Sequence, residues 1–543
     1  MRALLLSICL LDGAALAQIR FEYQPIPFRL ENSETPNRHA PETMAGGVAL
    51  FDYDNDGDLD IYFANGANVT TLRKDDRKYA NRLFANDGKG RFTDVTEKAG
   101  VAGSGFDMGV AVGDYDNDGF ADLFVGGVHK NTLFHNNGNG TFSDVTSGTG
   151  IEARDANAGP LWSVGGVWMD ANRDGRLDLF VVNYLAWDRE TERACMDTGV
   201  REYCHPKFYK RTPNDLYLNA GGGTFRRASE AYGLRAHPGK GMGVAAGDFN
   251  GDGWPDVFVP NDKATNTMFA NREGKRFEEV AFESGTALLD SGESISGMGT
   301  DARDLDNDGL LDLMLVALDN ETFPVYRNAG NGVFTDVTAR TGMAAASLTM
   351  AGFSVNLADF DNDGWRDAFV SRGHVQSLNA APRVTVEQHN SVLRNIAGKT
   401  FAPLTAEAGF ATQPPARHRG AAVGDLDGDG RLDVVVTALA KPAEIWRNAS
   451  PDVGSWIALK LVGTKSNRDG VGAAVKVSAG KFASYDQRFM TAGYSSSSAG
   501  PMHFGLGPDV AQVDVEIRWP SGIVQRLQGV KARQVFRVTE AAE

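Results

Sequence analysis

A nine-residue pattern, D-x-[DN]-x-D-G-x-x-D, occurs seven times along the sequence and constrains the fold more than any other feature. The copies are Asp52–Asp60, Asp114–Asp122, Asp170–Asp178, Asp248–Asp256, Asp304–Asp312, Asp359–Asp367 and Asp425–Asp433. Successive copies start between 55 (359−304) and 78 (248−170) positions apart. Such spacing indicates an array of similar structural units rather than one irregular domain.

The sequence around each copy also repeats. A small, apolar stretch precedes the pattern and an apolar run follows it, as in Gly109–Gly113 and Leu123–Val125. Two further motifs come next: N-x-L-F-x-N, at Asn131–Asn136 and with drift at Asn214–Asn219 and Asn266–Asn271, and G-x-F-x-D-V-T, at Gly90–Thr96, Gly140–Thr146 and Gly332–Thr338. Each unit thus offers four short β-type segments between Gly, Asp and Asn turns, which is typical of a propeller blade. We predict an all-β fold, a seven-bladed β-propeller over residues 18–450.

The seventh unit is incomplete. No G-x-F-x-D-V-T segment follows Asn448, whereas the N-terminal residues Ile19–Tyr23 alternate as a strand does and have no unit of their own. We predict that this segment completes the last blade and closes the ring, which would hide the open strand edges.

The chemistry of the repeated pattern points to calcium, a hard cation that takes six to eight oxygen ligands. Position 6 is always Gly, which tolerates the positive φ of a sharp turn. Position 7 varies freely, as expected where only a backbone carbonyl binds. The candidate ligands are Asp52, Asp54, Asp56, Asp58 and Asp60; Asp114, Asp116, Asp118, Phe120 and Asp122; Asp170, Asn172, Asp174, Arg176 and Asp178; Asp248, Asn250, Asp252, Trp254 and Asp256; Asp304, Asp306, Asp308, Leu310 and Asp312; Asp359, Asp361, Asp363, Trp365 and Asp367; and Asp425, Asp427, Asp429, Arg431 and Asp433.

Other metal sites fit the pattern less well. An EF-hand needs Glu at position 12, where this chain has apolar residues. Zinc prefers Cys or His, and magnesium keeps its water too firmly. An Asx-rich turn without metal is the remaining alternative. We expect up to seven Ca²⁺ ions in structural roles, with weaker binding where Asn172 and Asn250 remove a charge.

The charge balance excludes some partners. The chain has 70 acidic and 54 basic residues and a formal charge of −16, so a nucleic-acid-coating surface is excluded. The loops account for 26 acids at positions 1, 3, 5 and 9 (5×4 + 2×3). Seven calcium ions would add about +14, leaving roughly −2.

The N-terminus has the features of a cleaved secretory leader, residues 1–17: Arg2, the apolar Leu4–Leu11 and the A-x-A signal Ala15–Ala17. No later segment reaches the length of a membrane helix. We expect a secreted protein, extracellular or periplasmic.

Cleavage leaves two cysteines, Cys195 and Cys204, which favours one disulfide. Two free thiols, or a partial metal site with His205, are the alternatives.

Long insertions are expected on one face. If the strands of a blade are named a to d in chain order, the Asp patterns are a–b turns, whereas residues 65–80, 184–213 and 372–388 are b–c connections on the opposite face. Insertions that gather on one face of a repeat array commonly form its binding surface. A covering flap fixed by the disulfide is an equally good interpretation of residues 194–211.

These residues resemble the FG-GAP/VCBS propellers, the type found in integrin α heads. The C-terminal residues 451–543 resemble the ASPIC/UnbV domain in Asn467–Ala473, Gly493–Ser496, His503–Gly507 and Trp519–Gly522, although Ser497 stands where that domain usually has Gln. The combination is similar to the cartilage acidic protein family, as is the Cys195–Tyr217 insertion. The resemblance implies secretion, calcium binding and recognition of a protein or glycan, with no settled activity.

The alternation at Trp456–Val462 and Val513–Trp519 predicts a small β-sandwich docked on the propeller, and Ser495–Ser498 is interpreted as a polar loop rather than a ligand site.

We expect a monomeric binding or adhesion protein rather than an enzyme, because no G-x-S-x-G elbow or phosphate loop is present. A secreted polysaccharide lyase or hydrolase on a calcium propeller is the alternative. It would require His, Tyr, Lys or Arg side chains to converge at the channel mouth. His205, His374 and His389, all at or near the b–c insertions, are the residues that could meet there.

Overall fold

The computed structural model describes residues 19–197, 199–377, 385–451 and 453–542. The expected leader, residues 1–17, lies outside them. Within the described part, no helix is long and apolar enough to cross a membrane.

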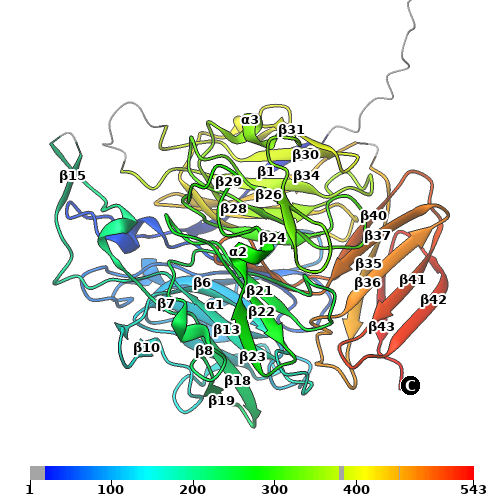
Figure 1. Ribbon diagram of the computed structural model, residues 1–543, viewed down its shortest axis with the longest axis horizontal. Coiled ribbons are helices and arrows are strands. Elements are labelled where there is room, and N and C mark those ends of the chain that lie inside the picture. The colour runs from blue at the N-terminus through cyan, green and yellow to red at the C-terminus, as the bar shows by residue number, and fades with distance from the viewer. Residues whose placement is uncertain (1–18, 198, 378–384, 452, 543) are drawn as a thin grey trace, which may run out of the picture.

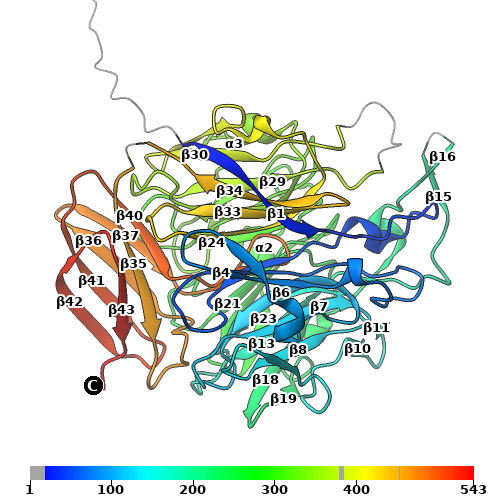
Figure 2. The same cartoon turned by 180° about the vertical axis from the view of Figure 1, so that it is seen from behind.

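The described residues form seven blades, each built on four antiparallel strands and arranged in a ring around a central channel. Figures 1 and 2 show the blades from opposite sides. Blade 1 consists of β2 (Val48–Phe51), β3 (Asp60–Phe63), β4 (Arg82–Asn86) and β5 (Phe92–Asp94); blade 2 of β6 (Phe106–Gly113), β7 (Asp122–Val128), β8 (Thr132–Asn136) and β9 (Phe142–Asp144); blade 3 of β12 (Ser163–Met169), β13 (Asp178–Asn183), β18 (Asp215–Gly221) and β19 (Thr224–Arg227); blade 4 of β20 (Ala245–Gly247), β21 (Asp256–Val259), β22 (Thr267–Arg272) and β23 (Arg276–Glu279). Blade 5 consists of β24 (Thr300–Arg303), β25 (Asp312–Leu315), β26 (Val325–Asn328) and β27 (Phe334–Asp336); blade 6 of β28 (Gly352–Ala358), β29 (Asp367–Arg372), β30 (Ser391–Ile396) and β31 (Thr400–Leu404); blade 7 of β32 (His418–Gly424), β33 (Asp433–Ala438), β34 (Pro442–Asn448) and β1 (Phe21–Arg29).

The ring closes as the sequence predicts. The first strand of each blade contacts the first strand of the next, and β32 of blade 7 contacts β2 of blade 1. The N-terminal β1 pairs antiparallel with β34, with Phe21 opposite Asn448 and Tyr23 opposite Trp446. The prediction that the N-terminal segment supplies the missing fourth strand is therefore confirmed.

Apolar side chains lie on both faces of the inner strands because each blade packs between two neighbours. Between blades 1 and 2, Phe51 and Tyr62 pack with Val112 and Leu123; all four are buried. The apolar runs on either side of each Asp loop are thus the contact surfaces between adjacent blades.

A repeated asparagine joins neighbouring blades. The last Asn of each N-x-L-F-x-N segment donates its Nδ2 hydrogen to the carbonyl at position 2 of the preceding blade's Asp loop, over 2.7–2.9 Å. The series includes Asn86 of blade 1, which bonds to Leu426 O of blade 7 across the closure. All seven asparagines are buried. This asparagine therefore links each blade to the preceding one by a hydrogen bond. Its recurrence at the same place in every repeat was the sequence signal for this contact.

The C-terminal residues form a β-sandwich, in orange and red in Figure 1. One sheet contains β35 (Ser455–Val462), β40 (Met502–Gly507) and β43 (Val535–Thr539); the other contains β36 (Ala474–Ala479), β37 (Phe482–Gln487), β41 (Gln512–Arg518) and β42 (Val524–Lys531). Ile457, Val477, Ile517 and Trp519 are in its core. Two short strands, β38 (Thr491–Ala492) and β39 (Ser496–Ser498), leave the sandwich and join the sheet of blade 1.

The connections between strands hold short elements. These are the helices α1 (Thr96–Ala99), α2 (Ala281–Ser284) and α3 (Met343–Ser347); the 3-10 turns η1 (Ala40–Thr43), η2 (Arg77–Tyr79), η3 (Pro206–Phe208), η4 (Leu234–Ala236) and η5 (Phe410–Thr412); and the strand pairs β10 (Arg154–Asp155) with β11 (Gly159–Pro160), β14 (Leu185–Ala186) with β17 (Lys210–Arg211), and β15 (Cys195–Asp197) with β16 (Val200–Glu202). The β15–β16 hairpin and the C-terminal sandwich lie at opposite ends of the molecule (Figures 1 and 2).

Candidate functional site

The seven Asp loops share one backbone geometry. The position-6 glycine has a φ between +83° and +100° in every loop, as the sequence predicts. Its N–H donates to the position-1 carboxylate over 2.7–3.1 Å. Several loops bring three carboxylates to within 4.8 Å of one another, among them Asp52, Asp54 and Asp60 in loop 1 and Asp359, Asp361 and Asp367 in loop 6.

The carboxylate at position 9 fastens each loop to the third strand of its blade. It accepts the N–H of loop position 2 and the N–H of the Asn that ends the third strand; in blade 1 these are Tyr53 at 2.9 Å and Asn86 at 2.8 Å from Asp60. The same pair of bonds recurs in the other six blades. Burial raises the pKa of Asp60 to about 8, because the charged form is poorly solvated.

Other loop oxygens are buried without a partner. Among the described residues, Oδ1 of Asp52 and Asp248 at position 1, and Oδ1 of Asp306, Asp361 and Asp427 at position 3, accept no hydrogen bond. Such orphaned oxygens cost free energy unless a cation or water meets them.

Blades 5, 6 and 7 bring an arginine to their loops. Arg327, Arg394 and Arg447 each stand just before the Asn that recurs in every blade, and they pair with position-3 carboxylates of their own blades. Arg394 Nη2 lies 2.8 Å from Asp361 Oδ2. Blade 2 has His135 at this place, whereas blades 1, 3 and 4 have Ala85, Leu218 and Ala270.

The C-terminal sandwich docks on the face that carries the loops. Lys460 Nζ lies 3.2 Å from Asp52 Oδ2, and Asp114 N donates to Asp469 Oδ2 over 2.8 Å. Asp248 N donates to Gln487 Oε1 over 2.9 Å, and Arg366 pairs with Asp486 at 3.0 Å. The sandwich therefore covers much of the loop face.

A segment of the C-terminal domain, Gly493–Ser498, fills the central channel; we call it the plug. Its polar atoms bond to the inner strands of blades 1, 2, 3, 5, 6 and 7. Gly493 exchanges two backbone bonds with Thr300, and Ser495 Oγ donates to Val164 O over 2.6 Å. Tyr494 is fully buried, and its hydroxyl donates to Met44 O near the far mouth. The interpretation of Ser495–Ser498 as an ordinary polar loop was wrong, because these serines satisfy inner-strand groups that the channel would otherwise leave unpaired.

Inner-strand glycines make room for the plug. A Cβ on Gly47 would lie 2.3 Å from Ser495 O, one on Gly299 2.7 Å from Gly493 C, and one on Gly420 2.6 Å from Ser496 Oγ. The small residues before the Asp pattern were the sequence signal for this contact, although they do not identify the segment that fills the channel.

The opposite mouth of the channel holds a cavity of about 260 Å³. It is lined by b–c connections of blades 3 to 6, including Tyr184, Asp262, Glu321 and His374, and by the N-terminal Ala40–Met44 region. The expected convergence of insertions on this face is therefore present in part, although residues 65–80 do not line the cavity.

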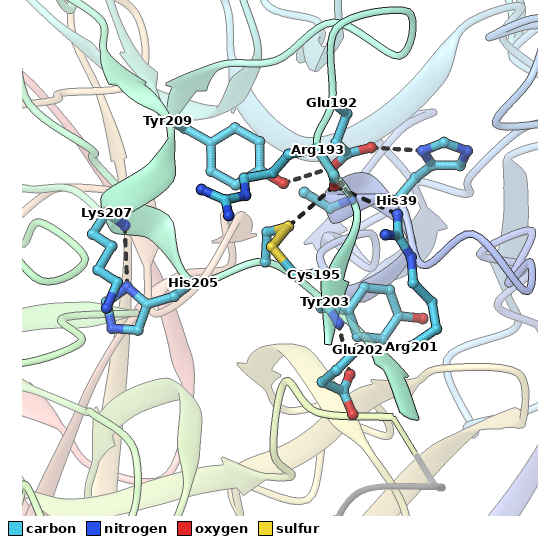
Figure 3. The surroundings of a disulfide bond; sticks show 12 residues. His39, Glu192, Arg193, Cys195, Arg201, Glu202, Tyr203, His205, Lys207 and Tyr209 are labelled. Carbon is cyan, nitrogen blue, oxygen red and sulfur yellow. Dashed lines mark hydrogen bonds and ion pairs between the residues drawn. A yellow bond between two sulfur atoms is a disulfide. The ribbon is translucent and has the colours of Figure 1, made fainter. Parts of the chain in front are cut away.

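The disulfide between Cys195 and Cys204 is present and closes the β15–β16 hairpin (Figure 3). The base of this hairpin lines the cavity. Glu192 fastens the insertion to the N-terminal segment: it accepts from Tyr209 Oη at 2.6 Å and lies 2.6 Å from His39 Nδ1. Tyr203 Oη donates to Glu42 over 3.1 Å. The insertion is thus a fixed wall of the cavity, which combines the two interpretations of this segment.

The three histidines do not meet as a group. His205 and His374 line the cavity, and His374 Nε2 lies 3.2 Å from Asp319 Oδ1. His389 is absent from the lining and lies near His418 and Arg372 instead. The convergence that the enzyme alternative requires is therefore met by His205 and His374 but not by His389.

Sequence profiles of two families match the chain. The FG-GAP-like repeat profile matches residues 52–125, 114–181, 208–259, 249–315 and 304–370, and the ASPIC and UnbV profile matches residues 463–543.

Similar proteins include cartilage acidic protein 1 of Xenopus tropicalis, 24% identical over 89% of this chain and 71% of that protein, and of Homo sapiens, 25% identical over 89% and 70%. Among solved structures, a rhamnogalacturonan lyase is 14% identical with a TM-score of 0.39, covering 79% of this chain and 75% of that one. A lectin of Agrocybe aegerita is 16% identical with the same TM-score, covering 74% and 87%. These scores are too low to support a functional comparison.

Proposed function

Because the chain belongs to the FG-GAP-like repeat family and carries an ASPIC and UnbV domain, we propose that it is a secreted, calcium-stabilised binding protein. Its partner is a protein or glycan recognised by the propeller face opposite the Asp loops. The observation that carries this proposal is the cavity on that face, lined by connections from four consecutive blades. The loop face is less available, since the C-terminal sandwich covers much of it.

Calcium binding is supported by the fit of the loops to a hard cation. Each loop presents side-chain oxygens at positions 1, 3, 5 and 9 and a carbonyl at position 7. The buried, unpartnered Oδ1 atoms of Asp52 and Asp361 are suited to a cation. When bound, calcium would neutralise the clustered carboxylates and stabilise the folded chain. We expect the tightest binding in loops 1 and 2, which have all-Asp side chains and no paired arginine.

The metal is tested by thermal melting and elemental analysis. At a free calcium concentration 100 times the dissociation constant, one site stabilises the folded state by about 2.7 kcal/mol. A chelator should therefore lower the melting temperature clearly, and added calcium should restore it. An unchanged melting curve together with no bound metal would refute the calcium proposal.

The partner is tested by screening glycans and surface proteins for binding, with and without chelator. Reproducible binding that a substitution at the cavity weakens would support the proposal. If only substitutions on the loop face weaken binding, the partner binds the loop face and the proposed site is wrong. Turnover of a glycan without stable binding would instead favour the secreted hydrolase or lyase.

Secretion is supported by the Cys195–Cys204 disulfide, a bond that persists in oxidising compartments. N-terminal sequencing of exported protein should begin at Gln18. Retention of the full chain inside the cell with reduced cysteines would contradict this part of the proposal.

A further inference from the structure

The cavity opposite the Asp loops is large enough for an organic ligand. Its volume of about 260 Å³ is more than ten times the 10–15 Å³ that one water molecule needs on the same kind of measure. Tyr184, Tyr203 and Tyr209 contribute aromatic surface to its lining, and Met298 and Leu318 contribute apolar surface. Side chains of this kind can hold the flat faces of a ligand.

The lining carries an excess of negative charge. Four carboxylates, Glu202, Asp262, Asp319 and Glu321, face one ammonium, Lys263, which gives −3 with both histidines neutral. Behind the lining, Lys240 and Arg419 donate to lining carbonyls, whereas Glu42 and Glu192 accept from the lining tyrosines, so these charges cancel and the net stays at −3. The pKa of His205 is lowered by burial and by nearby lysines, so this histidine adds no charge at neutral pH.

The lining also has more acceptors than donors. Asp262 accepts from the Tyr184 hydroxyl at 2.6 Å, and Glu321 pairs with Lys263 and accepts from Ser296 N at 2.8 Å and from Ser296 Oγ at 3.4 Å. A carboxylate offers about four lone-pair sites, so each retains capacity for a further donor. Gln376 Oε1 is buried at the cavity and accepts no hydrogen bond from the described residues.

From this complementarity we infer that the cavity binds a guanidinium cation, such as that of arginine, presented free or as a side chain of a protein partner. A guanidinium is planar, always charged and has five donors, and it stacks on aromatic rings. An anionic polysaccharide is disfavoured, because its carboxylates would meet the negative lining. The inference rests on the proposed function, since it specifies what the cavity-bearing face recognises.

The test is calorimetric titration of the full chain, saturated with calcium, with three probes. These are free arginine, arginine capped at both ends as an acetyl amide, and citrulline, whose neutral urea group has nearly the same shape. We expect arginine or its capped form to bind at least fivefold more tightly than citrulline. Preference for the capped form indicates a protein side chain, and preference for the free form indicates a small molecule.

Variants locate the site. Glu321→Gln and Asp319→Asn each remove one lining charge with little change in shape, and each should weaken arginine binding at least fivefold. Glu283→Gln, on the exposed surface of α2, is the matched control and should leave binding unchanged. Melting curves establish that each variant is folded.

Equal affinity for arginine and citrulline, no binding of either arginine probe, or unchanged affinity in both cavity variants would overturn the inference. The proposed function fails separately, if the screen finds no partner for the propeller face at all. A glycan partner that binds this face while arginine does not would overturn the inference and leave the proposed function intact.

Discussion

The plug gives a sharp test of how the C-terminal domain stabilises the propeller. Gly493 has a φ of +71°, and a Cβ there would lie 2.0 Å from Ser354 Oγ. This hydroxyl oxygen accepts the N–H of Tyr494 at 3.0 Å. The substitution Gly493→Ala should therefore strain the backbone and displace the serine that holds the plug.

The expected magnitude follows from these two effects. A non-glycine residue in the left-handed region costs roughly 1–2 kcal/mol. Loss of the bond to the buried Tyr494 N–H costs about 1–3 kcal/mol, because this donor has no access to water. We expect Gly493→Ala to lower the free energy of unfolding by about 2–5 kcal/mol.

The matched control is Gly480→Ala. Gly480 has a φ of +59°, and its Cβ would meet nothing within 4 Å. This variant should therefore show only the backbone cost of about 1–2 kcal/mol. Urea denaturation at saturating calcium measures both variants.

Hydrogen exchange supplies the local readout. The amides of Val110 and Thr300 donate to Ser495 O and Gly493 O, so both should exchange faster in Gly493→Ala and remain protected in Gly480→Ala. Equal destabilisation of the two variants, with unchanged exchange at these amides, would refute the view that the plug holds the channel together.

Three further predictions concern other contacts. Deletion of residues 19–30 removes the strand that pairs with β34 and should abolish cooperative melting; a normal melting curve would contradict ring closure by β1. Asn395→Ala removes the buried bond to Leu305 O of the preceding blade and two bonds within its own blade, to Arg366 O and from Gly398 N. It should cost at least about 1–3 kcal/mol in urea denaturation, whereas a cost near zero would mean that the bond between blades is dispensable. Burial alone would raise the pKa of Glu540, but hydrogen bonds from Ser521 and from the backbone of residues 464–466 lower it to about 2. This stabilisation is complete above the unfolded pKa of about 4.3 and is lost as the pH falls toward 2. The stability difference between the wild type and Glu540→Gln should therefore shrink over that range, and a difference independent of pH would contradict it.

Features encoded within each repeat were predictable from the sequence. The positive φ at Gly57 and its counterparts follows from the pattern itself, and the pairing of β1 with β34 follows from the missing segment after Asn448. The disulfide followed from a count of two cysteines in the expected mature chain. These inferences need only local chemistry and the regularity of the repeat.

Contacts between distant, non-repeating segments were not predictable. Ser495 bonds to Val164, 331 positions away, and nothing in a run of serines distinguishes a buried plug from a surface loop. The cavity lining combines single residues from several unlike connections, so no motif marks it. His389 illustrates the limit: its place next to an insertion fixes the face of the propeller, whereas the direction of its side chain depends on its neighbours.

Closure by β1 also has a consequence for how the chain is made. Arg20 N bonds to Ser450 Oγ, 430 positions later. At synthesis rates of about 5–20 residues per second, the first strand waits roughly 20–90 s for its partner to be made. During that time the growing row of blades has an open edge at each end, which is a template for pairing with another chain. Export and folding of this protein should therefore depend on chaperones that shield the N-terminal strand until the seventh blade arrives.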